Sequence, residues 1–153
     1  KTTAMIYIII IGAGVFTYFM TITRMPSALV SFISQFNIPD LLVLLFLLFI
    51  YLILGSIFDT VAAMLVTLPV VLPLIVSMGY NPIWWGIVNV VVIETGMITP
   101  PIGLNVFVLH GVTRVPLSTI YKGTMPFVIA DLVRIALLVL FPFLVLWLPG
   151  VIN

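Results

Sequence analysis

Residues 94–105, ETGMITPPIGLN, combine oxygen-bearing side chains with a sequence that interrupts a helix. Glu94, Thr95, Thr99 and Asn105 supply carboxylate, hydroxyl and amide oxygens in an otherwise apolar stretch of the chain. The two adjacent prolines remove two backbone N–H donors, and glycines on either side weaken the helix further. In lipid, such a break is tolerated only where the freed backbone groups are buried in protein or face a wet cavity. A broken span with polar side chains near mid-membrane is typical of the ion or substrate sites of secondary transporters.

A second polar interruption, GSIFDT at residues 55–60, separates two apolar arms. An unpaired carboxylate in hydrocarbon is costly, so Asp59 is expected to face a cavity or a partner, or to cap the helix that begins at Thr60. Hydroxyl and amide oxygens, with carbonyls left free before the two prolines, suit Na⁺. We therefore expect the Asp59 tip and the 95–105 loop to form one Na⁺ site. Helix N-termini at the two breaks would add positive dipole ends for a substrate carboxylate.

Composition places these elements in a lipid bilayer. Of the 153 residues, 64% are hydrophobic and 6% are charged, whereas soluble domains carry roughly 25% charged residues. Such a chain cannot cover a water-facing surface, so the expected fold class is an all-α integral membrane protein. The net charge of +1 comes without a basic patch, and no nucleic-acid partner is expected. The sequence has no cysteine and no phosphate-binding or nucleophile motif, so neither enzymatic activity nor a cofactor is expected.

The chain is predicted to form one membrane domain, and hydrophobic periodicity and helix breakers divide that domain into several elements. These are a span over residues 4–23, an interfacial helix over 26–39, a hairpin over 40–78, a broken span over 82–113 and a span over 125–148. Asp40 is expected to cap the first arm of the hairpin, and Pro69 and Pro73 to shorten its second arm. Asp131 and Arg134 are spaced i,i+3, so they are expected to pair on one helix face.

The hairpin over residues 40–78 permits two interpretations. Its arms could be two full spans joined by a very tight loop, or a re-entrant hairpin whose tip stops inside the membrane. The connection has no Lys or Arg and almost no loop length, which favours the re-entrant hairpin. The distribution of basic residues predicts that the connection holding Arg114 and Lys122 is cytoplasmic.

Three segments together carry one pattern: GSIFDT, TLPVVLPLIVSMGYNPIWWGIV and ETGMITPPIGLNVFVLHGV. In order, the pattern is Gly, Asp, two spaced prolines and then Gly-x-x-Thr-Pro-Pro-x-Gly-x-Asn. From about residue 55 to 149, this pattern resembles the C-terminal half of the large, DctM-like permease subunit of tripartite ATP-independent periplasmic (TRAP) transporters. Because the chain opens at Lys1 rather than at a Met, we expect it to be a fragment of such a larger permease.

The resemblance implies an ion-transporter-like fold with two inverted repeats, each holding a re-entrant hairpin and a broken helix. This chain would be most of the second repeat. It also implies import of organic anions, such as carboxylates or sialic acid, driven by a Na⁺ gradient across a bacterial or archaeal cytoplasmic (inner) membrane. A periplasmic binding protein would deliver the substrate. A small four-helix membrane subunit, separate or fused, would buttress the large one.

By this resemblance, residues 55–60 are the hairpin tip and residues 96–105 the loop of the broken helix. The residues expected to bind the ion are Gly55, Asp59, Gly96, Thr99 and Pro100. Those expected to bind substrate are Ser56, Thr60, Thr95, Gly103 and Asn105. Glu94, Pro101, Asp131 and Arg134 are expected to be structural, and a direct role of Glu94 with ion or substrate stays open.

Two other functions stay open. The chain could belong to another Na⁺- or H⁺-coupled anion carrier, or to a membrane assembly subunit with no transport of its own. A carrier needs polar residues that converge at mid-membrane from separate segments, as Asp59 and residues 95–105 are expected to do. An assembly subunit would instead show small residues four apart, and Gly12 and Gly14 are too close together for that pattern.

Overall fold

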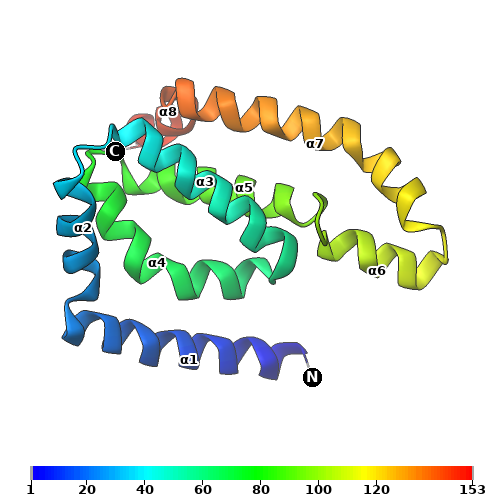
Figure 1. The fold of residues 1–153 in the computed structure, drawn as a ribbon, viewed down its shortest axis with the longest axis horizontal. Helices are drawn as coiled ribbons and strands as arrows, with labels where there is room; N and C mark the ends of the chain where they lie inside the picture. Colours follow the sequence, from blue (N-terminus) through cyan, green and yellow to red (C-terminus); the bar gives the residue numbers. More distant parts are fainter. Residues whose placement is uncertain (1, 153) are drawn as a thin grey trace.

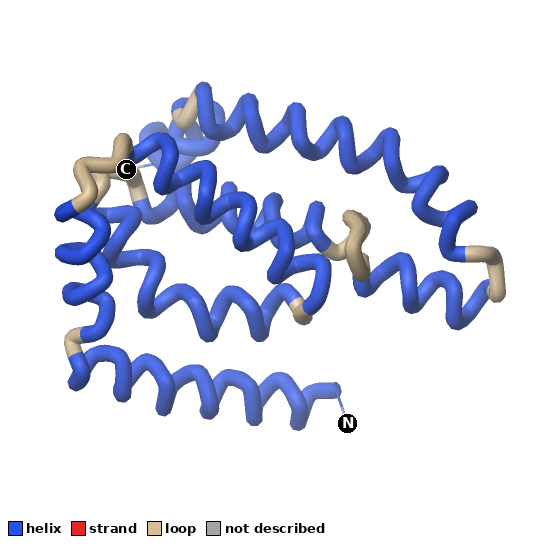
Figure 2. The backbone as a smooth tube through the Cα atoms, in the orientation of Figure 1, coloured by secondary structure: helices blue, strands red, loops and turns tan. Residues whose placement is uncertain are grey.

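The computed structural model of the chain describes residues 2–152 as eight helices, with no strand in that range (Figure 1). The helices are α1 (Thr2–Thr23), α2 (Met25–Gln35), α3 (Asp40–Ile57), α4 (Thr60–Ser77), α5 (Pro82–Gly96), α6 (Leu104–Thr113), α7 (Leu117–Leu140) and α8 (Phe143–Ile152). Short loops join them, drawn in tan in Figure 2. The all-α fold class expected from composition is confirmed.

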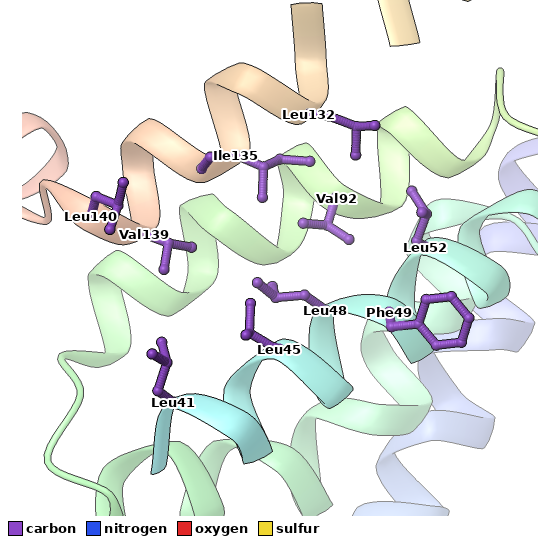
Figure 3. Close-up of a pocket in the computed structure, with 11 residues that line it drawn as sticks. Leu41, Leu45, Leu48, Phe49, Leu52, Val92, Leu132, Ile135, Val139 and Leu140 are labelled. Carbon is purple, nitrogen blue, oxygen red and sulfur yellow. The ribbon is translucent and has the colours of Figure 1, made fainter. Parts of the chain in front are cut away.

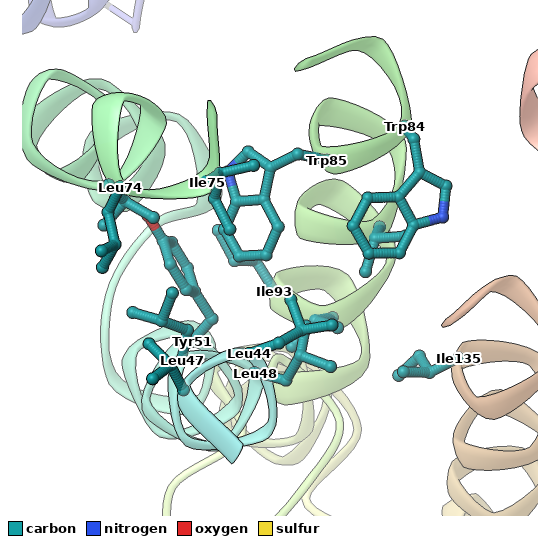
Figure 4. Close-up of a cluster of buried hydrophobic side chains, with 14 of the residues drawn as sticks. Leu44, Leu47, Leu48, Tyr51, Leu74, Ile75, Trp84, Trp85, Ile93 and Ile135 are labelled. Carbon is teal, nitrogen blue, oxygen red and sulfur yellow. The ribbon is translucent and has the colours of Figure 1, made fainter. Parts of the chain in front are cut away.

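Helices α3 and α5 form the core of the structure. They pack against each other through a buried cluster of aromatic and aliphatic side chains (Figure 4). The ring of Trp85, which is fully buried, meets the ring of Tyr51 edge-to-face with 5.6 Å between the centroids. Trp84 donates from Nε1 to the carbonyl oxygen of Leu138 at 2.8 Å and so ties α5 to α7. Buried aromatic side chains supply much of the apolar contact area in such a core, and the Trp84 bond satisfies the polar end of its ring.

The hairpin of α3 and α4 ends beside the interruption between α5 and α6. Helices α3 and α5 run parallel, because Tyr51 meets Trp85 while Gly55, one turn later, meets Ile93 and Gly96. Their C-terminal ends therefore lie side by side. In Figure 1, the turn between α3 and α4 is level with the loop after α5, whereas α6 continues farther in the same direction. A short hairpin thus packs against the first half of a longer, interrupted helix.

Most of the outer surface is apolar. Four helices are long and apolar enough, by length and composition, to cross a membrane: α1, α3, α4 and α7. Large hydrophobic side chains on these helices are exposed, among them Tyr18, Phe46 and Phe127. Exposed apolar area on this scale marks a surface that lipid or other membrane helices cover. The chain is part of a multi-pass membrane protein.

An apolar groove of about 480 Å³ lies between α3, α5 and α7 (Figure 3). Leu48 on α3, Val92 on α5 and Ile135 on α7 line it, and its remaining lining residues are also aliphatic or aromatic. A polar solute would lose its hydrogen bonds to water there without gaining others. The groove is therefore unsuited to an ion or an organic anion, and the candidate site lies elsewhere.

The final helix differs from the span predicted over residues 125–148. Helix α7 begins earlier, after Pro116, and ends at Leu140, and α8 follows as a separate helix. Pro142 explains the end of α7, because proline cannot donate a backbone N–H and disfavours helical geometry in the residue before it. That residue, Phe141, has φ and ψ of −125° and 72°.

Three smaller expectations also need correction. The interfacial helix predicted over residues 26–39 is the shorter α2. Asp40 does not cap α3, because the helix begins at Asp40 itself, Pro39 occupies the capping position and no side chain makes a capping bond. Pro69 and Pro73 do not shorten the second arm, since α4 continues through both of them. Membrane helices tolerate prolines where neighbouring helices and local adjustment satisfy the freed carbonyls.

Candidate ion and substrate site at two helix breaks

Two glycines bring the hairpin against the broken helix. A Cβ atom on Gly55 would overlap the carbonyl oxygen of Ile93 and lie 2.8 Å from its Cα. A Cβ atom on Gly96 would lie 2.5 Å from the carbonyl oxygen of Leu52 and 2.9 Å from the Cα of Gly55. Small residues of this kind let membrane helices approach closely. The two glycines expected at the ion site thus form the contact that sets the last turns of α3 and α5 side by side.

Asp59 caps the second arm of the hairpin. Its exposed carboxylate accepts hydrogen bonds from the backbone N–H groups of Val61 and Ala62, with N···O distances of 3.0 and 3.2 Å. This satisfies two of the N–H groups that the first turn of α4 leaves without a helical partner. One of the roles predicted for Asp59 is confirmed. The bonds also occupy the positive end of α4, so this helix end is closed to a substrate carboxylate.

Thr60 links the hairpin tip to the broken helix. Its Oγ1 lies 3.0 Å from Oε1 of Glu94, to which it donates, and 3.0 Å from Sδ of Met97. A hydroxyl has one proton to donate, and an ionised carboxylate is the stronger acceptor, so the bond to Glu94 dominates. The side chain of Glu94 therefore joins the two breaks through this hydrogen bond.

The interruption between α5 and α6 leaves backbone carbonyls without helical partners. In a continuous helix, the carbonyls of Ile98 and Thr99 would accept from the N–H groups of residues 102 and 103, but neither accepts a backbone hydrogen bond here. The chain is instead held by the backbone N–H of Asn105, which donates to the carbonyl oxygen of Met97 at 3.1 Å. The break thus leaves the carbonyl oxygens of Ile98 and Thr99 without backbone hydrogen-bond partners among the described residues.

The start of α6 is held by backbone hydrogen bonds, because the N–H groups of Val106 and Phe107 both donate to the carbonyl oxygen of Gly103. Gly103 precedes the helix with a φ of 60°, a left-handed conformation that glycine adopts without strain, and no side chain caps the helix. The peptide bond between Pro100 and Pro101 is cis. The hydroxyl of Tyr121 on α7 donates to the carbonyl oxygen of Ile102 at 2.5 Å and fastens the loop from outside. In the first turn of α6, the N–H of Leu104 makes no backbone hydrogen bond among the described residues, whereas those of Asn105, Val106 and Phe107 are engaged, so this helix end is largely occupied, as that of α4 is.

Three hydroxyl groups near the breaks are oriented by their own helices. Ser56, Thr95 and Thr99 each donate to a carbonyl three or four residues earlier, at 2.8, 2.7 and 2.6 Å. Ser56 and Thr95 are fully buried, whereas Thr99 is half-buried. Because each proton is already used, these oxygens offer only lone pairs to another group. Thr99, the accessible one, is suited to a cation rather than to an anion.

The structure does not join Asp59 to the broken helix directly. Its hydrogen bonds within the described chain go to the first turn of α4, and Thr60 makes the link instead. Met97 and Tyr121 also contact the breaks, and no sequence pattern indicated this, because a Met in an apolar stretch is typical of packing and Tyr121 lies in the connection that holds Arg114 and Lys122. Asp131 and Arg134 form the predicted ion pair at 2.9 Å, on α7.

A family model described as "Tripartite ATP-independent periplasmic transporter, DctM component" matches residues 1–144. The chain belongs to this family. The C4-dicarboxylate TRAP transporter large permease protein of Pseudomonas aeruginosa is 32% identical over 150 residues, which are 98% of this chain and 35% of that protein. The sialic acid TRAP transporter large permease protein of Vibrio cholerae is 26% identical over 149 residues, 97% of this chain and 35% of that protein.

The isethionate TRAP transporter permease protein of Oleidesulfovibrio alaskensis is 29% identical over 127 residues, 83% of this chain and 20% of that protein. This DctM-family chain thus spans about a third or less of the length of these relatives. The family is one of transport permeases, and the resemblance read from the sequence is confirmed.

Proposed function

We propose that this chain is the part of a Na⁺-coupled TRAP permease in which a re-entrant hairpin and a broken helix build half of the ion and substrate site. The observation that carries the proposal is the 3.0 Å hydrogen bond from Thr60 to Glu94, which joins the two breaks. A carrier needs polar groups from separate segments to converge at one place, and this bond supports such a convergence.

Na⁺ fits the oxygen atoms at this junction. The carbonyls of Ile98 and Thr99 lack backbone hydrogen bonds, and the Thr99 hydroxyl has already donated its proton. Glu94 adds a carboxylate within reach of the hairpin tip. A bare charge is costly in low dielectric, so a cation bound here would be neutralised by co-transport of an anion.

The transported solute is proposed to be an organic anion, such as a carboxylate or sialic acid. The named relatives act on C4-dicarboxylates, sialic acid and isethionate. The N-terminus of α6 has no side-chain cap, and Asn105 in its first turn is exposed. The backbone N–H of Leu104 makes no backbone hydrogen bond among the described residues, and it is proposed to donate to the carboxylate at the positive end of the helix.

The proposed setting is a bacterial or archaeal inner membrane, with the chain forming most of the second inverted repeat of the permease. The hairpin would be re-entrant, because its tip is level with the break rather than with the far end of α6 (Figure 1). A small four-helix membrane subunit and a periplasmic binding protein would complete the transporter.

The test is Na⁺-dependent uptake by the complete transporter in proteoliposomes. Thr99→Ala should raise the half-saturating Na⁺ concentration, because it removes a proposed ligand. Thr113→Ala is the matched control, since Thr113 makes the same bond to its own helix, at 2.7 Å to Leu109, but lies at the far end of α6. A wild-type Na⁺ curve for Thr99→Ala would place the cation elsewhere.

Asp59 is tested in the same assay. Asp59→Asn keeps the capping oxygen and removes the charge, so a raised half-saturating Na⁺ concentration would assign the charge to the ion site. Asp40→Asn is its control, because Asp40 lies at the opposite end of α3 and makes no capping bond. If uptake in the wild type is independent of Na⁺, another coupling ion is the better explanation. If the wild type shows no uptake, an assembly subunit without transport is the better explanation.

A further inference from the structure

Among the residues that the structure describes, three buried polar atoms in the core lack hydrogen-bond partners. They are Nε1 of Trp85 and both polar atoms of the Asn89 side chain, and the two residues are fully buried on α5. An unsatisfied buried polar atom costs about 1–3 kcal/mol, so three of them together in an apolar interface require a reason.

The neighbouring Tyr51 has unused capacity to accept a hydrogen bond. Its hydroxyl on α3 donates to Oγ1 of Thr67 on α4 at 2.6 Å, and Thr67 in turn donates to the carbonyl oxygen of Ala63 at 2.7 Å. The hydroxyl protons of Tyr51 and Thr67 are therefore both donated toward α4, and the lone pairs of the Tyr51 oxygen are left free to accept a hydrogen bond. The side chain of Asn89 lies beside this hydroxyl.

Two hydrogen bonds would satisfy all three unpaired atoms. Nδ2 of Asn89 can donate to the Tyr51 oxygen, and Nε1 of Trp85, one helical turn before Asn89, can donate to Oδ1 of Asn89. The rings of Trp85 and Tyr51 already touch, with 5.6 Å between centroids (Figure 4).

We propose that Asn89 is a positioning residue, the middle of a hydrogen-bonded chain that runs from Trp85 through Tyr51 and Thr67 and fixes the register of the hairpin against the broken helix. The inference rests on the proposed function, because register matters only if the two breaks must be aligned. A single buried Asn can specify register between packed helices, since sliding by one turn leaves its amide against apolar side chains.

Alignment of the breaks depends on this register. Sliding α5 by one turn would displace Glu94 by about 5.4 Å along the helix axis and break its 3.0 Å bond to Thr60. Asn89 touches neither break, so it would affect the ion site only through the placement of the hairpin.

The first measurement reports alignment without transport. The chain has no native cysteine, and Oγ1 of Thr60 lies 3.0 Å from Sδ of Met97. Thr60→Cys with Met97→Cys, in an otherwise cysteine-free complete transporter, should therefore crosslink with a short bifunctional thiol reagent. Adding Asn89→Leu should slow this crosslinking by about two- to tenfold, the effect expected from losing one hydrogen bond.

The second measurement separates the chain of bonds from general packing. Tyr51→Phe keeps the ring contact and removes the hydroxyl, so it should slow crosslinking in the same way, and its effect should not add to that of Asn89→Leu. Thr67→Val should do likewise. Thr17→Val is the matched control, because Thr17 makes the same bond to its own helix, at 2.8 Å to Ala13, without a partner on another helix.

The third measurement is uptake in the transporter with Thr60 and Met97 intact. Asn89→Leu should raise the half-saturating Na⁺ concentration. A lower melting temperature for Asn89→Leu, with an unchanged crosslinking rate and an unchanged Na⁺ curve, would show that Asn89 only contributes to packing and would overturn the proposal. A higher melting temperature with unchanged crosslinking would also overturn it, because it would show that the amide has no partner. If uptake proves independent of Na⁺ but crosslinking still slows, the proposed function fails and the positioning role stands.

Discussion

Replacing Gly96 with alanine is expected to push the hairpin away from the broken helix. The new Cβ would lie 2.5 Å from the carbonyl oxygen of Leu52 and 2.9 Å from the Cα of Gly55. Ordinary contacts of a Cβ atom begin near 3.4 Å, so α3 and α5 would have to separate by about 1 Å. Both obstructing atoms belong to backbone, which cannot turn aside as a flexible side chain can.

The expected cost follows from two opposing terms. Overpacking a tight contact costs about 1–3 kcal/mol. Alanine is a better helix former than glycine by up to about 1 kcal/mol, which offsets part of that cost. The net loss in free energy of unfolding is therefore up to about 2 kcal/mol. A separation of 1 Å would also lengthen the 3.0 Å bond between Thr60 and Glu94 beyond hydrogen-bonding distance.

The assay is thermal melting of the purified complete transporter, together with Na⁺-dependent uptake in proteoliposomes. Gly86→Ala is the matched control, because Gly86 lies in the same helix and a Cβ there meets no atom within 4 Å. The Gly96→Ala variant should melt at a lower temperature than the wild type and show slower uptake. The Gly86→Ala variant should melt at the same temperature as the wild type or slightly higher. Equal melting and equal uptake for the two variants would refute the close contact of α3 and α5.

Three further predictions concern the tip and the break. Thr60→Val keeps the shape of the side chain but removes the bond to Glu94, so the transporter should lose about 0.5–1.5 kcal/mol of stability, measured by melting, and should transport more slowly. Replacing both Pro100 and Pro101 with alanine should let the helix continue and occupy its free carbonyls, so Na⁺-stimulated uptake should be lost while membrane insertion is kept. A cysteine at Ile57, beside the tip, should react poorly with membrane-impermeant thiol reagents in sealed vesicles if the hairpin is re-entrant.

Each of these predictions has an outcome that contradicts it. An unchanged melting temperature and unchanged uptake in Thr60→Val would mean that the hydrogen bond to Glu94 does not contribute to stability or transport. A wild-type Na⁺ dependence in the double proline variant would mean that the prolines only bend the helix. Rapid labelling at position 57 from the cytoplasmic side, in every transport state, would show two full spans.

Local patterns in the sequence determined the secondary structure and the places where it is interrupted. Asp59 caps α4, and Asp131 pairs with Arg134, because both interactions depend on spacing within one helix. The prolines at 100 and 101 interrupt a helix wherever that helix lies. The span predicted over residues 125–148 differs from α7 at its end because Pro142 interrupts the apolar run, and the effect of a proline on the preceding residue is also local.

Only the tertiary structure decided which residues meet. Thr60 and Glu94 are 34 residues apart, and nothing in their spacing fixes the register of α3 and α4 against α5. Contacts between helices set that register, among them the approach of Gly55 to Gly96 and the meeting of Tyr51 with Trp85. In sequence, a glycine or a tyrosine in an apolar run is compatible with many helix pairings. Steric fit between two particular backbones, and the need to satisfy buried polar groups, select one of them.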